Sequence, residues 1–126
     1  MSDHHEGGCY CGSIRFRIVG EIESPGLCHC DNCRKATGGH VVAWVTAKRG
    51  DLEITKGELK RYRTPTNAWR GFCPDCGCSI TYENDKRPEE VDITTGSMDH
   101  PELFPPEWDA FEDERLPWVG KAVKES

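Results

Sequence analysis

Eight cysteines in 126 residues, gathered in three short groups, restrict the fold of this chain more than any other feature of its sequence. In a Cys-x-Cys pair on a strand, both sulfurs point to the same face of the sheet. A Cys-x-x-Cys pair fits a tight turn, and Pro74 and Gly77 around one such pair favour that turn. Two such pairs from separate segments supply the tetrahedron that zinc prefers. The groups are Cys9-x-Cys11, Cys28-x-Cys30-x-x-Cys33 and Cys73-x-x-Cys76-x-Cys78.

The first residues of the chain indicate a compartment in which thiols stay reduced. The segment MSDHHEGG is polar and acidic and lacks the apolar stretch of a secretory signal, and no apolar run reaches the length of a membrane span. We therefore expect a cytoplasmic protein without a membrane partner, whose clustered cysteines bind metal rather than form disulfides. His4 and His5 could bind metal, but we expect residues 1–7 to be a frayed terminus.

Four of the cysteines form a natural closed site. Cys9, Cys11, Cys73 and Cys76 join a terminal pair to a distant turn, and their four thiolates fill the tetrahedron of a structural zinc. Such a site stabilises the fold and leaves no coordination position for a substrate. The alternative is a pair of buried or redox-active dithiols.

Cys28, Cys30 and Cys33 remain as three thiolates within six residues. Three protein ligands and one exchangeable position are the usual arrangement of a catalytic zinc, whose fourth position takes water, a substrate thiol or a carbonyl oxygen. Two alternatives stay open: Cys78 completes this set and closes the site, or the cluster is empty and only redox-sensitive. Outside such a set, Cys78 would be a small buried hydrophobic residue.

Charged neighbours of this group are candidate substrate contacts. Three thiolates on Zn²⁺ leave a net negative charge, which Arg34 and Lys35 would offset while steering an anionic substrate; the alternative is a solvated charged pair. His29 could be a fourth ligand or a proton shuttle, but we expect it on the exposed side of the turn. The basic stretch 60–63 is expected to be the exposed face of a strand.

Alternating apolar residues predict a mainly β chain with little or no helix. Ile14, Phe16 and Ile18 alternate with Arg15 and Arg17, as in a half-buried antiparallel strand, and no stretch of helix length shows a helical period. The predicted strands cover residues 10–20, 40–47, 52–55, 59–63, 68–73, 79–83 and 91–98.

The remaining segments are expected to be irregular parts of a single domain over residues 1–126. This length leaves room for one core, which metal sites would help to stabilise. Residues 21–27 contain Pro25-Gly26 and are expected to form a turn. The tail over 101–126 is expected to wrap irregularly over the sheet, with Trp108, Phe111 and Trp118 as plugs.

The cysteine motifs resemble those of the glutathione-dependent formaldehyde-activating (GFA) family, whose domain also occurs in proteins of the centromere-protein-V type. The resemblance has seven cysteines in the same order and extends through Gly38-Gly39 and Trp44 to the tail, so it covers most of the chain. It implies a β-tent fold of small antiparallel sheets and hairpins, shared with methionine sulfoxide reductase B and a Rab-binding zinc protein. The matching motifs are Gly8-Cys9-x-Cys11-Gly12, Cys28-His29-Cys30-x-x-Cys33-Arg34 and Phe72-Cys73-x-x-Cys76-Gly77.

The resemblance also implies an activity and two zinc sites. The family activity joins formaldehyde to the thiol of glutathione, giving S-hydroxymethylglutathione, and cleaves the same carbon–sulfur bond in reverse. Two departures bear on the substrate: the tail stops soon after Trp118, and Asp109 stands where many members carry a histidine. A reductase activity is not expected, because no cysteine follows Cys78. The implied ligands are Cys9, Cys11, Cys73 and Cys76 for a structural zinc, and Cys28, Cys30 and Cys33 for a catalytic zinc.

The leading hypothesis is a zinc-dependent carbon–sulfur lyase of the S-(hydroxymethyl)glutathione synthase type. Zinc at the three-cysteine group would bind the thiol or polarise the aldehyde oxygen, and Arg34 and Lys35 would hold a glutathione carboxylate. The alternatives are a non-catalytic zinc module that binds a protein partner and a glutathione carrier without turnover. A formal net charge of −6 argues against nucleic acid as a partner, because phosphate contacts need a basic surface.

Overall fold

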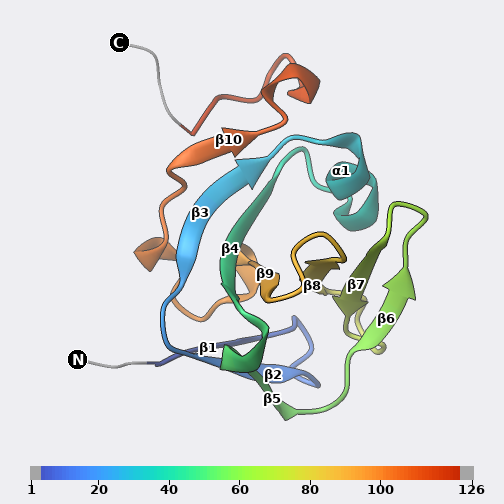
Figure 1. Cartoon of the computed structure of the whole chain (residues 1–126), viewed down its shortest axis with the longest axis vertical. Coiled ribbons are helices and arrows are strands. Elements are labelled where there is room, and N and C mark those ends of the chain that lie inside the picture. The colour runs from blue at the N-terminus through green and yellow to red at the C-terminus, as the bar shows by residue number, and fades with distance from the viewer. Residues whose placement is uncertain (1–3, 123–126) are drawn as a thin grey trace.

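The computed structural model describes residues 4–122, which contain ten strands, one α-helix and four short 3-10 helices (Figure 1). Strand residues make up 44% and helical residues 16%, so the expected mainly β fold class is confirmed. The strands are β1 (His4–Gly8), β2 (Arg15–Val19), β3 (Glu23–Cys28), β4 (Val42–Lys48), β5 (Leu52–Lys56), β6 (Lys60–Arg63), β7 (Ala68–Phe72), β8 (Ser79–Asn84), β9 (Glu90–Thr94) and β10 (Trp108–Ala110). The helices are α1 (Asp31–Thr37), η1 (Arg49–Asp51), η2 (Thr95–Ser97), η3 (Pro101–Leu103) and η4 (Glu112–Glu114).

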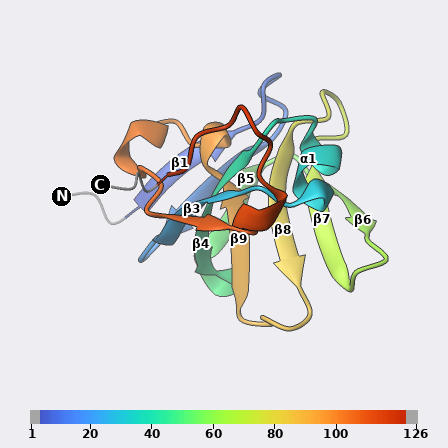
Figure 2. The same cartoon turned by 90° about the horizontal axis from the view of Figure 1, so that it is seen from above.

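The strands form two sheets. A three-stranded antiparallel sheet has the order β1-β2-β5, and a seven-stranded sheet has the order β10-β3-β4-β9-β8-β7-β6. In the larger sheet the pair of β10 with β3 is parallel and the other named pairs are antiparallel. The small sheet lies at one end of the molecule, and α1 and β10 lie at the other (Figure 1). The view from above shows β9, β8, β7 and β6 side by side (Figure 2).

The small sheet begins in the segment that was expected to be frayed. β1 pairs with β2 from His4 opposite Val19 to Gly8 opposite Arg15, so the expectation of a frayed terminus is wrong from residue 4 onward. Residues 1–3 lie outside the described residues. A polar segment becomes a strand here because its backbone donors and acceptors find partners on β2. The predicted alternation on β2 is confirmed, since Phe16 is fully buried.

β3 corrects the expectation of a turn over residues 21–27. The strand accommodates Pro25 because the register between β3 and β4 shifts between Glu23 and Gly26, where a missing N–H does not interrupt the ladder. Along its other edge β3 pairs with β10, and Trp108 lies opposite Gly26. The tail that was expected to be irregular therefore contributes a strand to the large sheet.

The helix α1 follows β3 and was not indicated by the sequence pattern. Its N-cap is Cys30, whose Sγ accepts a hydrogen bond from the amide of Cys33 at 3.4 Å. It ends at Gly38, which adopts the left-handed conformation and donates its amide to the carbonyl of Arg34. Seven residues are too few to produce a recognisable helical period. Within residues 4–122, no helix is long and apolar enough to cross a membrane.

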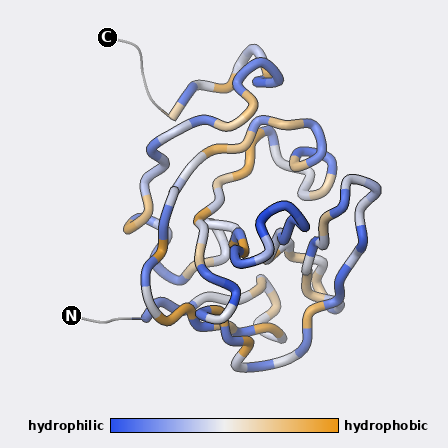
Figure 3. Tube along the Cα trace, in the orientation of Figure 1, coloured by the Kyte–Doolittle hydropathy of each residue, from blue (hydrophilic) through white to orange (hydrophobic). Residues whose placement is uncertain are grey.

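The main core joins the two sheets through buried apolar side chains of β2, β4, β8 and β9. A smaller cluster surrounds Trp44 and includes Cys33 of α1 and the N-cap Cys30. Apolar residues lie along β4 and in the small sheet, whereas the connection between β8 and β9 is strongly hydrophilic (Figure 3). The expected aromatic plugs are not in the core: Trp108, Phe111 and Trp118 are 48%, 59% and 67% exposed. The strands already fill the core, so these rings lie outside it.

Candidate metal centres and active-site cavity

The first cysteine cluster connects the two sheets. Cys9 and Cys11 lie between β1 and β2, and Cys73 and Cys76 lie between β7 and β8. The four sulfurs lie within 4.8 Å of one another, with Cys11 Sγ 3.6 Å from Cys9 Sγ and 3.7 Å from Cys73 Sγ. Backbone amides donate to two of the sulfurs, that of Ile14 to Cys9 at 3.2 Å and that of Cys76 to Cys73 at 3.4 Å. Such bonds stabilise thiolates, so the cluster suits a closed metal site.

The second cluster lies where β3 leads into α1. Cys28 ends β3, Cys30 caps α1 and Cys33 lies in its first turn. Their three sulfurs are within 4.8 Å of one another, and Cys28 Sγ lies 3.4 Å from Cys30 Sγ. All eight cysteines are free thiols. The cysteines that lie together are those grouped by their spacing in the sequence, and their role as metal ligands stays a prediction.

Cys78 does not complete the second cluster. It packs against the main core, and its Sγ donates to the carbonyl of Ser79 at 3.7 Å. The charged groups that act on it are Cys76, Cys9 and Cys11 of the first cluster. Within residues 4–122, the second cluster thus consists of three sulfurs.

The three thiols of the second cluster differ in proton affinity. The pKa of Cys33 is lowered to about 5, chiefly by its hydrogen bond with Cys28, and the guanidinium of Arg70 lowers it further. The same contact with Cys33, together with burial, raises the pKa of Cys28, and burial raises the pKa of Cys30. The negative charge of the group therefore concentrates on Cys33, whose Sγ lies 3.6 Å from Nη2 of Arg70.

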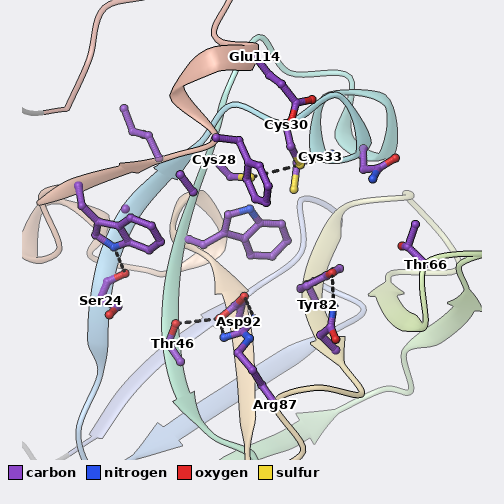
Figure 4. A pocket seen from close by; sticks show the side chains of 18 of the residues that line it. Ser24, Cys28, Cys30, Cys33, Thr46, Thr66, Tyr82, Arg87, Asp92 and Glu114 are labelled. Atoms are coloured by element: carbon purple, nitrogen blue, oxygen red, sulfur yellow. Dashed lines mark hydrogen bonds and ion pairs between the residues drawn. The ribbon is translucent and has the colours of Figure 1, made fainter.

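A cavity of about 480 Å³ opens beside the second cluster, and all three of its cysteines line the wall. Figure 4 shows these cysteines at one end of the cavity near Glu114, with Asp92 and Arg87 toward the other end. The volume is in the range of sites for small ligands. The aromatic residues of the lining are Trp44, Tyr82, Trp108 and Phe111. Two of the exposed aromatic residues of the tail, Trp108 and Phe111, therefore line this cavity.

The cations of the cavity are not the predicted ones. Arg34 and Lys35 do not belong to the lining, whereas Arg70 and Arg87 do. Nη1 of Arg34 donates to the carbonyl oxygens of His29 and Glu114, at 3.1 and 2.6 Å, and so fastens α1 to the C-terminal segment. The place of Arg70 beside the second cluster depends on the strand order of the large sheet, which the residues beside the cysteines do not reveal. The signal available in the sequence was a single arginine within the aromatic strand 68–72.

His29 corrects the expectation of an exposed side chain. It is fully buried, and its Nε2 lies 2.8 Å from Oδ1 of Asp109, whose side chain is 2% exposed. Among the described residues, Nδ1 of His29 has no hydrogen-bond partner. Both carboxylate oxygens of Asp109 also accept from the amide of Ala122 at 3.0 Å. β10 alternates, so Asp109 faces His29 while Trp108 and Ala110 line the cavity.

The donor chemistry of both clusters fits a soft metal ion. Each consists of sulfur atoms alone, close enough together to reach one ion without a disulfide. Four sulfurs are the donor set of a tetrahedral structural site, and three sulfurs beside a cavity match a site with one exchangeable position. Both clusters can therefore hold metal ions.

Comparisons with known proteins agree with this geometry. The profile of the family described as glutathione-dependent formaldehyde-activating enzyme matches residues 4–114. A protein of Halomonas elongata, provisionally named a glutathione-dependent formaldehyde-activating enzyme, is 30% identical over 112 residues, covering 81% of this chain and 70% of that protein. The crystal structure of a Rhodobacter sphaeroides protein is similar with a TM-score of 0.59 and 27% identity, covering 75% of this chain and 87% of that one.

Fold and site together define a mainly β protein with two all-cysteine clusters, one of them facing a cavity. The chain belongs to the glutathione-dependent formaldehyde-activating enzyme family. The matched region, residues 4–114, contains both clusters and the whole of β10. The resemblance noted in the sequence is therefore confirmed.

Proposed function

We propose that this chain is a zinc enzyme that joins a glutathione-type thiol to a small aldehyde such as formaldehyde, and reverses that reaction as a carbon–sulfur lyase. The observation that carries the proposal is the cluster of Cys28, Cys30 and Cys33, whose three sulfurs lie within 4.8 Å of one another and line a cavity. Membership of the formaldehyde-activating family supports the choice of thiol and aldehyde. We place the reaction in the cytoplasm, where thiols stay reduced.

The proposed reaction is an addition without net oxidation or reduction. A carbon–sulfur bond forms between the thiol and the aldehyde carbon, the S–H bond breaks, and the carbonyl oxygen takes up a proton to become a hydroxyl group. The reverse reaction breaks the carbon–sulfur bond and returns the proton to sulfur. Zinc, when bound by the three cysteines, supplies a Lewis acid that favours the thiolate form of a thiol near neutral pH.

The surrounding residues would position the substrates and limit access of water. Trp44, Trp108 and Phe111 line the cavity with apolar surface, and a drier cavity strengthens electrostatic interactions with the reacting groups. The four-cysteine cluster would hold a second, structural zinc that secures β7 and β8, which carry the opposite wall. The contact of Arg34 with Glu114 supports the segment that completes the cavity.

Exchange between formaldehyde and its glutathione adduct tests this proposal directly. The two also react without a catalyst, so the informative quantity is the exchange rate measured by nuclear magnetic resonance with and without protein. The wild type should accelerate the exchange, and Cys30→Ser should abolish the acceleration with loss of one zinc. Cys78→Ser is the matched control, because this cysteine lies outside both clusters, and it should behave like the wild type.

Two outcomes would contradict the proposal. If exchange in the presence of the zinc-loaded wild type is no faster than in buffer, the proposed activity is wrong. If calorimetry then detects glutathione binding, the chain is a glutathione carrier. Equal acceleration by the wild type and by a folded, zinc-deficient Cys30→Ser variant would exclude the three-cysteine cluster as the site.

A further inference from the structure

The two arginines that line the cavity differ in their partners. Arg87 is paired with carboxylates: its Nη2 lies 2.6 Å from Oδ2 of Asp92, and its Nη1 lies 3.1 Å from Oε1 of Glu90. Thr46 also donates to Asp92 at 2.7 Å and holds that carboxylate in place. Among the described residues, Arg70 has no carboxylate partner, so the cavity contains one guanidinium that is not paired with a carboxylate and contacts only the sulfur of Cys33 among acidic groups.

Arg70 is held at a fixed place beside the three-cysteine cluster. It lies opposite Tyr82 in the register of β7 and β8, and its guanidinium carbon is 4.6 Å from the centroid of the Tyr82 ring. The Tyr82 hydroxyl accepts a hydrogen bond from Nδ2 of Asn84 at 2.9 Å, which fixes the ring. Nη2 of Arg70 reaches Cys33 Sγ at 3.6 Å. The aromatic face thus supports the guanidinium at the edge of the sulfur cluster.

We propose that Arg70 selects thiols that carry a carboxylate, by binding that carboxylate in the cavity while the thiol lies at the three-cysteine cluster. The inference rests on the proposed function, and it replaces Arg34 and Lys35 as the cations that recognise the substrate. A guanidinium has five N–H donors, and the sulfur contact occupies one nitrogen, so the rest of the planar group is available for a paired contact with a carboxylate.

Charge compensation of the sulfur cluster alone would not account for this arrangement. A positive charge at this place could be supplied by a lysine, whereas stacking on Tyr82 orients a flat donor group toward the cavity. Charge compensation and carboxylate binding predict different affinities. If Arg70 only compensates the charge of the sulfurs, replacing it does not change the preference for an acid over its ester. If Arg70 binds the substrate carboxylate, the protein binds the acid more tightly than the ester, and this preference depends on Arg70.

The test compares S-methylglutathione with its diethyl ester by calorimetry on the zinc-loaded protein. Neither compound has a free thiol, so binding is measured apart from turnover. The wild type should bind the acid at least about 10-fold more tightly than the ester, as a charge-assisted contact with a carboxylate allows. In Arg70→Gln this ratio should fall to near one. In Arg70→Lys it should fall several-fold, because an ammonium group cannot form the paired contact.

Arg61→Gln is the matched control, since this arginine lies on the neighbouring strand, is exposed and does not line the cavity. It should keep the wild-type ratio. An unchanged ratio in folded Arg70→Gln, or no preference in the wild type, would overturn the inference. If Arg70→Gln does not fold, Arg70→Lys decides, and a wild-type ratio in that variant overturns the inference.

The outcome is distinguishable from failure of the proposed function. If the protein prefers the acid through Arg70 but does not accelerate adduct exchange, the inference about Arg70 holds and the proposed enzymatic function is wrong. If the protein accelerates exchange but binds the acid and the ester equally, the proposed function holds and the inference about Arg70 is wrong.

Discussion

His29 and Asp109 are 80 residues apart and meet in a fully buried contact of 2.8 Å between Nε2 and Oδ1. The histidine stands between two cysteines of the candidate metal centre, and the aspartate belongs to β10, the last strand of the large sheet. The amide of His29 donates to the carbonyl of Ala110 at 3.0 Å, so backbone and side chain both tie the cysteine loop to this strand. The pair therefore holds the geometry of the loop from outside the cavity.

Asp109→Ala should destabilise the fold and loosen the three-cysteine site. Loss of the acceptor leaves the buried Nε2 of His29 and the half-buried amide of Ala122 without this partner, which costs about 1–3 kcal/mol of unfolding free energy. Zinc affinity of that site should fall about 10-fold, as for other residues that orient metal ligands. Thermal unfolding and chelator competition measure the two effects. Asp113→Ala is the control, because this exposed aspartate lies on η4 of the same segment, and it should change stability by less than about 0.5 kcal/mol. Equal results for both variants would contradict the assigned role.

The zinc content of single cysteine variants should distinguish the three-cysteine cluster, the four-cysteine cluster and Cys78. We expect two zinc ions in the wild type and in Cys78→Ser, and one in a folded Cys30→Ser. Cys73→Ser should lose the structural ion and much of its stability, because Cys73 is fully buried where the two sheets meet the cluster. Elemental analysis together with thermal unfolding provides the measurement. Loss of one zinc from Cys78→Ser would show that the cluster membership is wrong.

Cys33 should ionise near pH 5 once the three-cysteine site is freed of metal. Its pKa is lowered to about 5, so it is a thiolate at neutral pH and takes up a proton as the pH falls through that value. Cys28 and Cys30, whose pKa values are raised, stay protonated over this range. A weak chelator that spares the four-cysteine site should permit the measurement by ultraviolet thiolate absorbance. Cys33→Ser should remove the transition, and Arg70→Gln should shift it to higher pH. A transition that persists in Cys33→Ser would refute the assignment.

Gly26→Ala should displace Trp108 from the cavity wall. A Cβ at this position would lie 2.6 Å from Nε1 of the indole, which also donates to the carbonyl of Ser24 at 3.2 Å. We expect a loss of about 1–3 kcal/mol in unfolding free energy and a change in tryptophan fluorescence as the ring swings outward. Gly96→Ala offers the comparison, because among the described residues no neighbouring atom lies within 4 Å of its added Cβ. If Gly26→Ala matches Gly96→Ala in stability and emission, the close packing of Gly26 against Trp108 is not significant.

Most strands and both cysteine clusters could be predicted from the sequence because their signals are local. Alternation marks β2, and the Cys-x-Cys and Cys-x-x-Cys spacings determine which sulfurs share a face or a turn. β3 was missed because Pro25 ordinarily ends a strand, and only its pairing partners reveal that the proline falls at a register shift. α1 was missed because a cysteine caps it, a residue outside the usual capping set.

The rest of the site could not be predicted because it depends on contacts between distant segments. The burial of His29 depends on Asp109, and the place of Arg70 depends on the strand order that sets β7 in the same sheet as β3. The aromatic tail residues were expected to fill the core, but the strands already fill it and the rings stay exposed. Arg34 illustrates the same limit, since it follows Cys33 in the sequence while its hydrogen-bond partners are the backbone carbonyls of His29 and Glu114.

The parallel pairing of β10 with β3 has a consequence for biosynthesis. Every other strand of the large sheet lies earlier in the chain, so the ribosome completes them before residues 107–114 emerge. Until then one edge of β3 has no neighbour, and the loop with Cys28, Cys30 and Cys33 lies open on that side. The three-cysteine loop of a nascent chain is therefore accessible on that side before the strand that walls the cavity is synthesised.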